Sequence, residues 1–177
     1  MLGLLSLIIW GLVALVGVIG NALFGGSSAT GANIPESEKC ALGTVSVVAM
    51  VTDGSVEQAQ FDQGMNPHLG YKISNNGSTA CKWDVGTLMQ KFVIKSGEEV
   101  IWNNQDCDRS NDESKVITLK PGETVASNTS STDWFRVRSS DTGCGEGQQP
   151  VDGGGALYKL TVTISGVISP ETEFTLF

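Results

Sequence analysis

The sequence predicts an all-β domain, an antiparallel β-sandwich of about eight or nine short strands, preceded by one transmembrane helix at the N-terminus. Three observations predict this organisation. Beyond residue 40, apolar and polar side chains alternate with a period of two, which is typical of half-buried strands. Residues that favour turns separate these stretches, and the first 24 residues carry no charged side chain.

The clearest strand is predicted over residues 156–165. Tyr158, Leu160, Val162 and Ile164 share one face there, while Lys and Thr side chains occupy the other face. A strand of this kind buries one face against a second layer, so the pattern favours a two-layer sandwich. A small barrel is the alternative that the same pattern allows.

Three polar segments predict tight turns between strands. Residues 75–78 tolerate positive φ and connect two alternating stretches, which predicts a hairpin. Residues 96–99 predict a second hairpin. In residues 120–123, Pro121 presets φ and Gly122 accepts the left-handed position of a turn.

Residues 1–24 predict a membrane anchor, because about 20 apolar residues at about 1.5 Å rise per residue span a hydrocarbon core of about 30 Å. A cleaved signal peptide is the main alternative, and a buried helix is a third. No Lys or Arg precedes the apolar run, which also allows a start site further upstream. Gly, Ser, Ala and Thr then predict a flexible linker over residues 25–39, followed by the β-domain over residues 40–177.

The charges of this protein all lie outside the apolar segment. The 19 acidic and 11 basic residues follow residue 35, so the part of the chain beyond the apolar segment carries the whole net charge of −8. Lys and Arg side chains supply most of the affinity for nucleic acids, and no cluster of three basic residues occurs. The composition therefore argues against a nucleic-acid partner and against attraction to an anionic membrane surface.

Four cysteines predict two disulfides, since their spacings fit no zinc pattern, in which two ligands usually lie roughly two to four residues apart. Three pairings are possible. We favour Cys107 with Cys144, between two polar loops, and Cys40 with Cys81, between the first strand and a later one. The disulfides and the charges predict a single-pass protein with its N-terminus inside and its domain extracytoplasmic, or a secreted one if residues 1–24 are cleaved.

One polar loop superficially resembles a calcium site, because Asp106, Asp108 and Asp112 offer carboxylate oxygens within a short span. The loop departs from the helix-flanked calcium loop, which requires glycine where Asn111 stands and glutamate where Ile117 stands. A solvated acidic loop pinned by a disulfide is the ordinary interpretation, and the three carboxylates are weak metal candidates.

Trp134, Arg136 and Arg138 combine an aromatic ring with two guanidinium groups, which could recognise a carboxylate or a glycan. The same combination also stabilises ordinary loops, so these residues are weak binding candidates. His68 is the only histidine, and its position after a proline is typical of an edge or solvated site. No Gly-x-Ser-x-Gly motif and no suitably spaced acidic pair occur, so we predict no catalytic residue, no cofactor and no enzymatic activity.

Several short motifs lie within residues 40–177: Ile101-Trp102, Asp106-Cys107, Leu119-Lys120-Pro121-Gly122-Glu123, Trp134-x-Arg136-x-Arg138-Ser139-Ser140, Cys144, Tyr158-Lys159-Leu160-Thr161-Val162 and Thr172-x-Phe174-x-Leu176. Together they resemble uncharacterised actinobacterial envelope proteins. The resemblance implies an N-terminal signal or anchor, a linker and one immunoglobulin-like domain of unknown function. It implies no catalytic residue. The chain departs from antibody-type domains, because no cysteine pair brackets a central tryptophan.

From these features we expect a non-enzymatic interaction module displayed on the outer side of the cytoplasmic membrane, with an envelope protein or a cell-wall component as its partner. One alternative is a domain that binds a small ligand, a glycan or calcium through the loops at residues 103–113 and 134–155. Another is a proteinase inhibitor built on a similar sandwich, which rests on analogy of fold alone.

Overall fold

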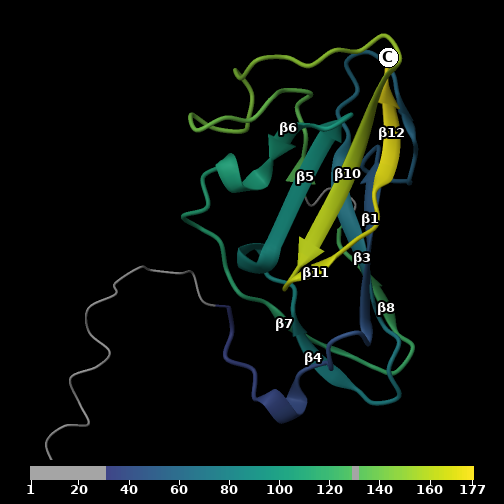
Figure 1. Ribbon diagram of the computed structural model, residues 1–177, viewed down its shortest axis with the longest axis vertical. Coiled ribbons are helices and arrows are strands. Elements are labelled where there is room, and N and C mark those ends of the chain that lie inside the picture. The colour runs from purple at the N-terminus through teal and green to yellow at the C-terminus, as the bar shows by residue number, and fades with distance from the viewer. Residues whose placement is uncertain (1–30, 129–131) are drawn as a thin grey trace, which may run out of the picture. The chain divides into compact units, whose positions relative to one another are not determined.

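The computed structural model describes residues 31–128 and 132–177, whose arrangement is shown in Figure 1. The predicted anchor at residues 1–24 lies outside the described residues. Within the described ranges the helices are three short 3₁₀ turns, and none of them is long and apolar enough to cross a membrane. The prediction of an all-β, largely antiparallel domain is confirmed.

Twelve strands occur in the described part of the chain, and nine of them have three or more residues. The strands are β1 (Val45–Thr52), β2 (Gln60–Phe61), β3 (His68–Asn75), β4 (Cys81–Asp84), β5 (Gln90–Ser96), β6 (Glu99–Asn103), β7 (Val116–Leu119), β8 (Thr124–Ala126), β9 (Thr132–Asp133), β10 (Ala156–Ile164), β11 (Val167–Ile168) and β12 (Thr172–Leu176). The 3₁₀ turns are η1 (Glu36–Glu38), η2 (Thr87–Met89) and η3 (Asn104–Asp106).

These strands form three sheets. One has the order β1-β3-β8, with β9 also beside β3, and a second has the order β2-β12-β10-β5-β6, with β11 beside β10. The third consists of β4 and β7. Strand β1 packs against β10, β11 and β12, so the first two sheets face each other as the layers of a sandwich (Figure 1). All the strand pairs are antiparallel except β2 with β12.

The alternation of side chains decides which face of each strand is buried. In β10 the predicted apolar face is buried and the residues between are partly exposed. Val162 lies opposite Phe92 of β5, and both are 0% exposed. Burying one such side chain stabilises a fold by about 1.5 to 3 kcal/mol. A slip of one residue would turn the whole apolar face of β10 towards solvent, so the pattern fixes the register.

The predicted turns have different outcomes. Residues 96–99 form the expected hairpin between β5 and β6. The hairpin predicted at residues 75–78 is wrong, because β3 already has β1 on one side and β8 on the other, and β4 pairs with β7 instead. The turn at residues 120–123 is formed, with a hydrogen bond of 3.0 Å from the Glu123 N–H to the Lys120 oxygen, but it connects strands of different sheets.

The compact domain begins earlier than the sequence predicted. Ile34, expected in the flexible linker, is 8% exposed. The Ala32 N–H donates a hydrogen bond of 3.0 Å to Asp84, and the Cys40 N–H donates one of 3.2 Å to the main-chain oxygen of Lys82. The linker prediction is therefore wrong for residues 31–39, because one buried apolar side chain and these long-range bonds hold them on the domain.

Both disulfides favoured from the sequence are formed. Cys40 is bonded to Cys81 with their Cα atoms 4.7 Å apart, and Cys107 is bonded to Cys144 with their Cα atoms 4.9 Å apart. The first bond joins the N-terminal segment to β4, and the second joins the loop after η3 to the loop before β10. Disulfides of this kind persist in oxidising compartments, so they suit an extracytoplasmic domain.

Candidate functional site

Two pairs of strands share one end of the domain, the lower end in Figure 1. Strand β3 pairs with β8, β4 pairs with β7, and the turns at residues 76–80 and 120–123 connect the two pairs. Asn75 is 0% exposed and holds this end together, since its Nδ2 atom donates hydrogen bonds to the main-chain oxygens of Thr79 (2.8 Å) and Leu119 (3.1 Å). The two pairs belong to different sheets, which leaves room between them beyond the turns.

A cleft of about 520 Å³ lies between these two pairs. Its apolar lining includes Ile73, Val85, Ile117 and Val125. Its polar lining consists mainly of amide and hydroxyl side chains, including Thr87, Gln90, Asn111, Ser127 and Asn128, together with Glu113 and Lys115. An apolar surface with a few polar groups around it is typical of sites that bind ligands.

Tyr71 of β3 also lines the cleft, and its side chain is held in one position. Its hydroxyl donates a hydrogen bond of 3.3 Å to the Val85 main-chain oxygen, and Gln90 Nε2 donates to the same oxygen (2.8 Å) and to the hydroxyl (3.5 Å). Burial raises the pKa of the Tyr71 hydroxyl, and the negative charge of Asp84 raises it further. The hydroxyl is therefore a neutral hydrogen-bond donor at physiological pH.

Asp84, the last residue of β4, fixes the wall of the cleft that lies opposite β3. It is 5% exposed, and its Oδ1 atom accepts hydrogen bonds from the N–H groups of Gly86 and Lys115, both 2.9 Å long. Its Oδ2 atom accepts from the Ala32 N–H (3.0 Å) and the Ser114 hydroxyl (2.7 Å). Burial alone would raise the pKa of Asp84, but these four hydrogen bonds outweigh that effect and lower it. The ionised carboxylate thus joins three segments of the chain.

Gly86 allows the segments around Asp84 to approach closely. A Cβ atom at this position would lie 2.1 Å from the Glu113 main-chain oxygen and 2.4 Å from the Lys115 nitrogen. Only glycine fits against the neighbouring backbone here. Neither Asp84 nor Gly86 stands out in the sequence, because the groups that define their roles, at Ala32 and at residues 113–115, lie far away along the chain.

The three weak metal candidates do not converge on one point. Asp106 Oδ2 accepts a hydrogen bond of 2.5 Å from the Ser139 hydroxyl, and Asp108 accepts one of 2.9 Å from a main-chain N–H two residues further on. Asp112 forms an ion pair of 2.6 Å with Arg109. Among the residues that the structure describes, no group of three His, Cys, Asp or Glu side chains is placed to hold a metal ion.

Trp134 lies in the core and not on a binding surface, which corrects its assignment as a binding candidate. It is 0% exposed, and its indole nitrogen donates a hydrogen bond of 2.8 Å to the Val137 main-chain oxygen. Its ring packs edge-on against Tyr158 and Phe174, with ring centroids 5.3 and 5.8 Å away. Its large apolar surface therefore stabilises the sandwich.

The other two binding candidates differ from each other. Arg138 forms an ion pair with Glu99, with Nη1 2.7 Å from Oε1, and this contact lowers the pKa of Glu99. Arg136 instead lines a second cavity, which also involves Phe135 and Phe177. Of the three residues, only Arg136 lines either this cavity or the cleft.

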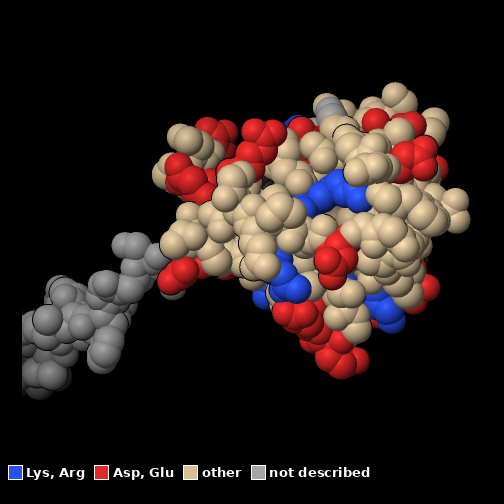
Figure 2. All heavy atoms as spheres, turned by 90° about the horizontal axis from the view of Figure 1, so that it is seen from above, with Lys and Arg blue, Asp and Glu red and all other residues tan. Residues whose placement is uncertain are grey.

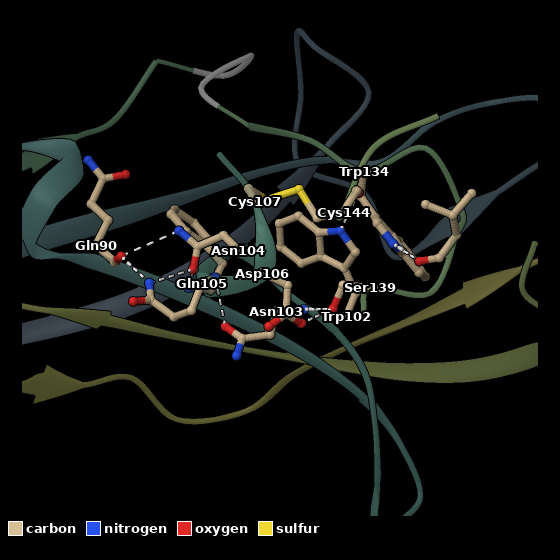
Figure 3. The surroundings of a disulfide bond; sticks show 12 residues. Gln90, Trp102, Asn103, Asn104, Gln105, Asp106, Cys107, Trp134, Ser139 and Cys144 are labelled. Carbon is tan, nitrogen blue, oxygen red and sulfur yellow. Dashed lines mark hydrogen bonds between the residues drawn. A yellow bond between two sulfur atoms is a disulfide. The ribbon is translucent and has the colours of Figure 1, made fainter. Parts of the chain in front are cut away.

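Figure 3 shows that the acidic loop and the segment around Ser139 meet beside the second disulfide. Trp102 is 1% exposed, and its indole nitrogen donates a hydrogen bond of 2.8 Å to the Cys144 main-chain oxygen. The Ser139 hydroxyl donates to Asp106 and accepts a hydrogen bond of 2.9 Å from the Asn103 N–H. These contacts tie the two loops to β6, so they provide rigidity at this end of the sheet.

His68, the only histidine of the chain, contacts the side chain of Asp133. Its Nδ1 atom lies 2.5 Å from Oδ1 of Asp133, and the two residues are directly paired across β3 and β9. This pair holds the short strand β9 on the sheet.

No family model matches the sequence, and no curated protein matches it. Among solved structures, the chain is similar to a β-glucosidase from Erythrobacter marinus, with a TM-score of 0.40, 15% identity and coverage of 75% of this chain and 15% of that one. A Pseudomonas fluorescens alkylpurine DNA glycosylase gives a TM-score of 0.38, 14% identity and coverage of 75% and 30%. A mutant β-glucosidase from Listeria innocua gives a TM-score of 0.36 and 16% identity, with coverage of 75% of this chain and 16% of that one. The chain spans less than a third of the length of these proteins, and the low scores carry no functional argument.

Proposed function

We propose that this protein is a non-enzymatic recognition module, an immunoglobulin-like domain held on the outer side of the cytoplasmic membrane by residues 1–24. The apolar run supports the anchor, the two disulfides support the oxidising side, and the motifs quoted above support a relationship with actinobacterial envelope proteins. An envelope protein or a cell-wall polymer is the proposed partner.

The strand order supports the immunoglobulin-like assignment. In that fold the first, second and fifth main strands share one sheet, while the third, sixth and seventh share the other, which some variants extend by one strand. The order β1-β3-β8 corresponds to the first of these sheets, and the order β12-β10-β5-β6 corresponds to the second sheet in its extended form. The short strands β2, β9 and β11 and the separate pair of β4 and β7 are set aside in this comparison. The hydroxyl of Tyr158, near the start of β10, donates a hydrogen bond of 2.7 Å to the Asp152 oxygen, as the tyrosine corner of such domains does.

The cleft between β3–β8 and β4–β7 is the observation that carries the proposed binding function. Its apolar side chains Ile73, Ile117 and Val125 lie on strands β3, β7 and β8. Asp84 and Asn75 fix the neighbouring loops from within the domain. A site on rigid elements loses little conformational entropy when a partner binds. Its many amide and hydroxyl side chains favour a glycan as a second candidate ligand, because such groups pair with sugar hydroxyls.

Crosslinking in intact cells tests the proposal. The exposed Ala126 lines the cleft, so Ala126→Trp should fill it and reduce recovery of a crosslinked partner at least fivefold. Thr118→Trp is the matched control, because Thr118 is exposed on β7 but does not line the cleft. Equal recovery of partners by wild type and Ala126→Trp would overturn the proposal.

A sedimentation assay with purified cell walls tests the glycan candidate separately. The wild-type protein should sediment with the walls, and Ala126→Trp should remain in the supernatant. Loss of sedimentation after enzymatic removal of the glycan would identify the polymer. If the protein crosslinks to a partner but does not sediment with cell walls, the partner is a protein.

A further inference from the structure

Strand β8 lies at the end of a sheet and beside the cleft. The sheet with the order β1-β3-β8 has two end strands, β1 and β8 (Figure 1). An end strand presents main-chain N–H and C=O groups that can pair with a further strand. At β1 this edge is closed, because the Val51 oxygen accepts a hydrogen bond of 3.0 Å from the Gln58 N–H, and Ala49 is only 2% exposed. The edge at β8 differs.

The main-chain groups of Thr124 and Ala126 point away from β3. Glu123 and Ser127, on either side of them, form main-chain hydrogen bonds of 3.0 and 2.8 Å to β3. In an antiparallel pair, residues alternate between those that bond to the neighbouring strand and those that face away from it. The N–H and C=O groups of Thr124 and Ala126 therefore lie along the outer edge of β8.

These edge groups are accessible to a partner. Thr124 and Ala126 are both exposed, and within residues 31–128 and 132–177 no hydrogen bond reaches their main-chain groups. They offer N–H and C=O groups at a repeat of two residues, which is the repeat of an extended peptide. Strand β8 also contains no charged residue and no proline, which are common means of protecting an edge from pairing.

The cleft lies on the inner side of this edge. Residues 125–128 line it, and so does Ile117 of β7. Val125 and Ile117 are partly buried and pack against the core. A strand added beside β8 would continue the sheet, so every second side chain would point to the same side as Val125. The cleft volume of about 520 Å³ offers room for these side chains.

Strand β7 provides a second edge, which suits pairing less well. The oxygen of Lys82, opposite Thr118, accepts a hydrogen bond of 3.2 Å from the Cys40 N–H, so Thr118 faces away from β4. The exposed Lys115 precedes this strand, and lysine and proline follow it at residues 120–121. Lysine and proline at an edge oppose pairing with another strand. The edge of β8 is therefore the better docking position.

The charge of the domain disfavours an anionic partner. Figure 2 shows one face, where acidic side chains dominate the periphery and basic ones lie in separate places. The net charge of −8 repels anionic polymers in general. Main-chain hydrogen bonds and apolar contacts require no charge on the ligand, so an extended peptide satisfies both the edge and the cleft.

We propose that β8 binds an extended peptide segment of a protein partner as an additional strand of its sheet. The main chain of the peptide pairs with Thr124 and Ala126, and its alternate side chains, which are apolar, occupy the cleft. This inference rests on the proposed function, because it names the chemistry of the partner at the same cleft. It selects a protein segment over a glycan, because a polysaccharide chain has no N–H and C=O groups at this repeat.

Calorimetric titration of the full chain in lipid nanodiscs tests the proposal, with heats from empty nanodiscs subtracted. The probes are acetylated peptide amides of the form Thr-X-Thr-X-Thr, in which X is Val, Leu, Ile or Phe. In an added strand only alternate N–H groups face β8. N-methylation of one alternate set, either Thr or X, should weaken the tightest probe at least tenfold, and N-methylation of the other set less than threefold. Equal effects of the two sets, or no binding by any probe, would overturn the proposal.

Proline substitutions test which edge binds the probe. Ala126→Pro removes an N–H group that has no partner within the described domain, and proline is tolerated in edge strands at such positions. It should weaken the tightest probe at least tenfold. Thr118→Pro, the matched change on β7, should alter binding less than twofold. Unchanged binding by Ala126→Pro, or loss of binding by Thr118→Pro alone, would show that β8 is not the docking edge.

Hydrogen exchange at single amides tests the wild-type protein, so it does not depend on whether a proline variant folds. The amides of Thr124 and Ala126 should exchange at least tenfold more slowly with the tightest probe bound, while the amide of Thr118 should keep its rate. A bound probe that protects neither Thr124 nor Ala126 would contradict the proposal.

Crosslinking in intact cells separates this inference from the proposed function. Ala126→Pro should lose the crosslinked partner as Ala126→Trp does. If Ala126→Trp loses the partner and Ala126→Pro keeps it, the added strand is wrong and the binding function of the cleft stands. If neither variant loses the partner, the proposed function fails and this inference fails with it.

Discussion

Replacing Asp84 with asparagine tests whether this carboxylate holds the wall of the cleft in place. The amide keeps the shape of the side chain, but one of its two acceptor oxygens becomes an NH₂ donor, so two of the four hydrogen bonds are lost. A hydrogen bond to a charged group contributes about 1.5 to 3 kcal/mol. Since Asp84 is 5% exposed, we expect Asp84→Asn to lower the free energy of unfolding by about 3 kcal/mol at pH 7.

Thermal unfolding with the disulfides intact measures this effect. For a chain of this size, 1 kcal/mol corresponds to roughly 2 to 4 °C in Tm, so Asp84→Asn should melt about 6 to 12 °C lower than wild type. The exposed Asp141 provides the control, because Asp141→Asn should change the free energy of unfolding by less than about 0.5 kcal/mol. If Asp84→Asn melts within about 2 °C of wild type, the loss in free energy of unfolding is roughly 1 kcal/mol or less, and the reasoning is refuted.

The pH dependence gives a second check on the same residue. The folded-state pKa of Asp84 is lowered from its ordinary value of 3.8, so the folded state favours the ionised form. The stability from this carboxylate is therefore fully present above its unfolded pKa and is lost as the pH falls through the lower folded pKa. The difference between wild type and Asp84→Asn should be constant from pH 7 to pH 5 and narrow below about pH 4. A difference that stays constant down to pH 2 would contradict this explanation.

Three further substitutions test other contacts. Gly86→Ala should lower stability by about 2 kcal/mol or more in urea unfolding, because the new Cβ would meet main-chain atoms, while Gly145→Ala, with open space around it, should have little effect. Replacing Cys107 and Cys144 together with serine should cost about 3 to 4 kcal/mol, since the bond closes a loop of 37 residues; unchanged thermal stability would refute this. Tyr158→Phe should lower stability by about 1 kcal/mol through loss of one hydrogen bond, and an unchanged urea midpoint would show that this bond contributes nothing.

The arrangement of the strands could be predicted only in part. Alternation along β10 identified its buried face, and the turn at residues 96–99 identified a hairpin, because both depend on neighbouring residues. The same reasoning gave a wrong hairpin at residues 75–78. Whether a turn joins paired strands depends on which strands already flank β3, and local sequence does not contain that information.

The candidate sites were harder to predict than the strands. Trp134 and Arg136 are two positions apart in one segment, but the first is buried in the core and the second lines a cavity. The role of Asp84 depends on donors at Ala32 and Ser114, which are 52 and 30 positions away. Short motifs identified polar and aromatic side chains without showing which of them face solvent.

The sequence by itself determined that this protein has an uncharged apolar segment, an acidic all-β domain and a favoured pairing of four cysteines, since composition and a period of two are properties of the chain. Only the tertiary structure decided that β3 and β4 belong to different sheets, that Asp84 joins three segments, and that Arg136 adjoins a cavity. The physical reason is that clefts and cavities form between segments distant in sequence, and their positions depend on how the sheets pack.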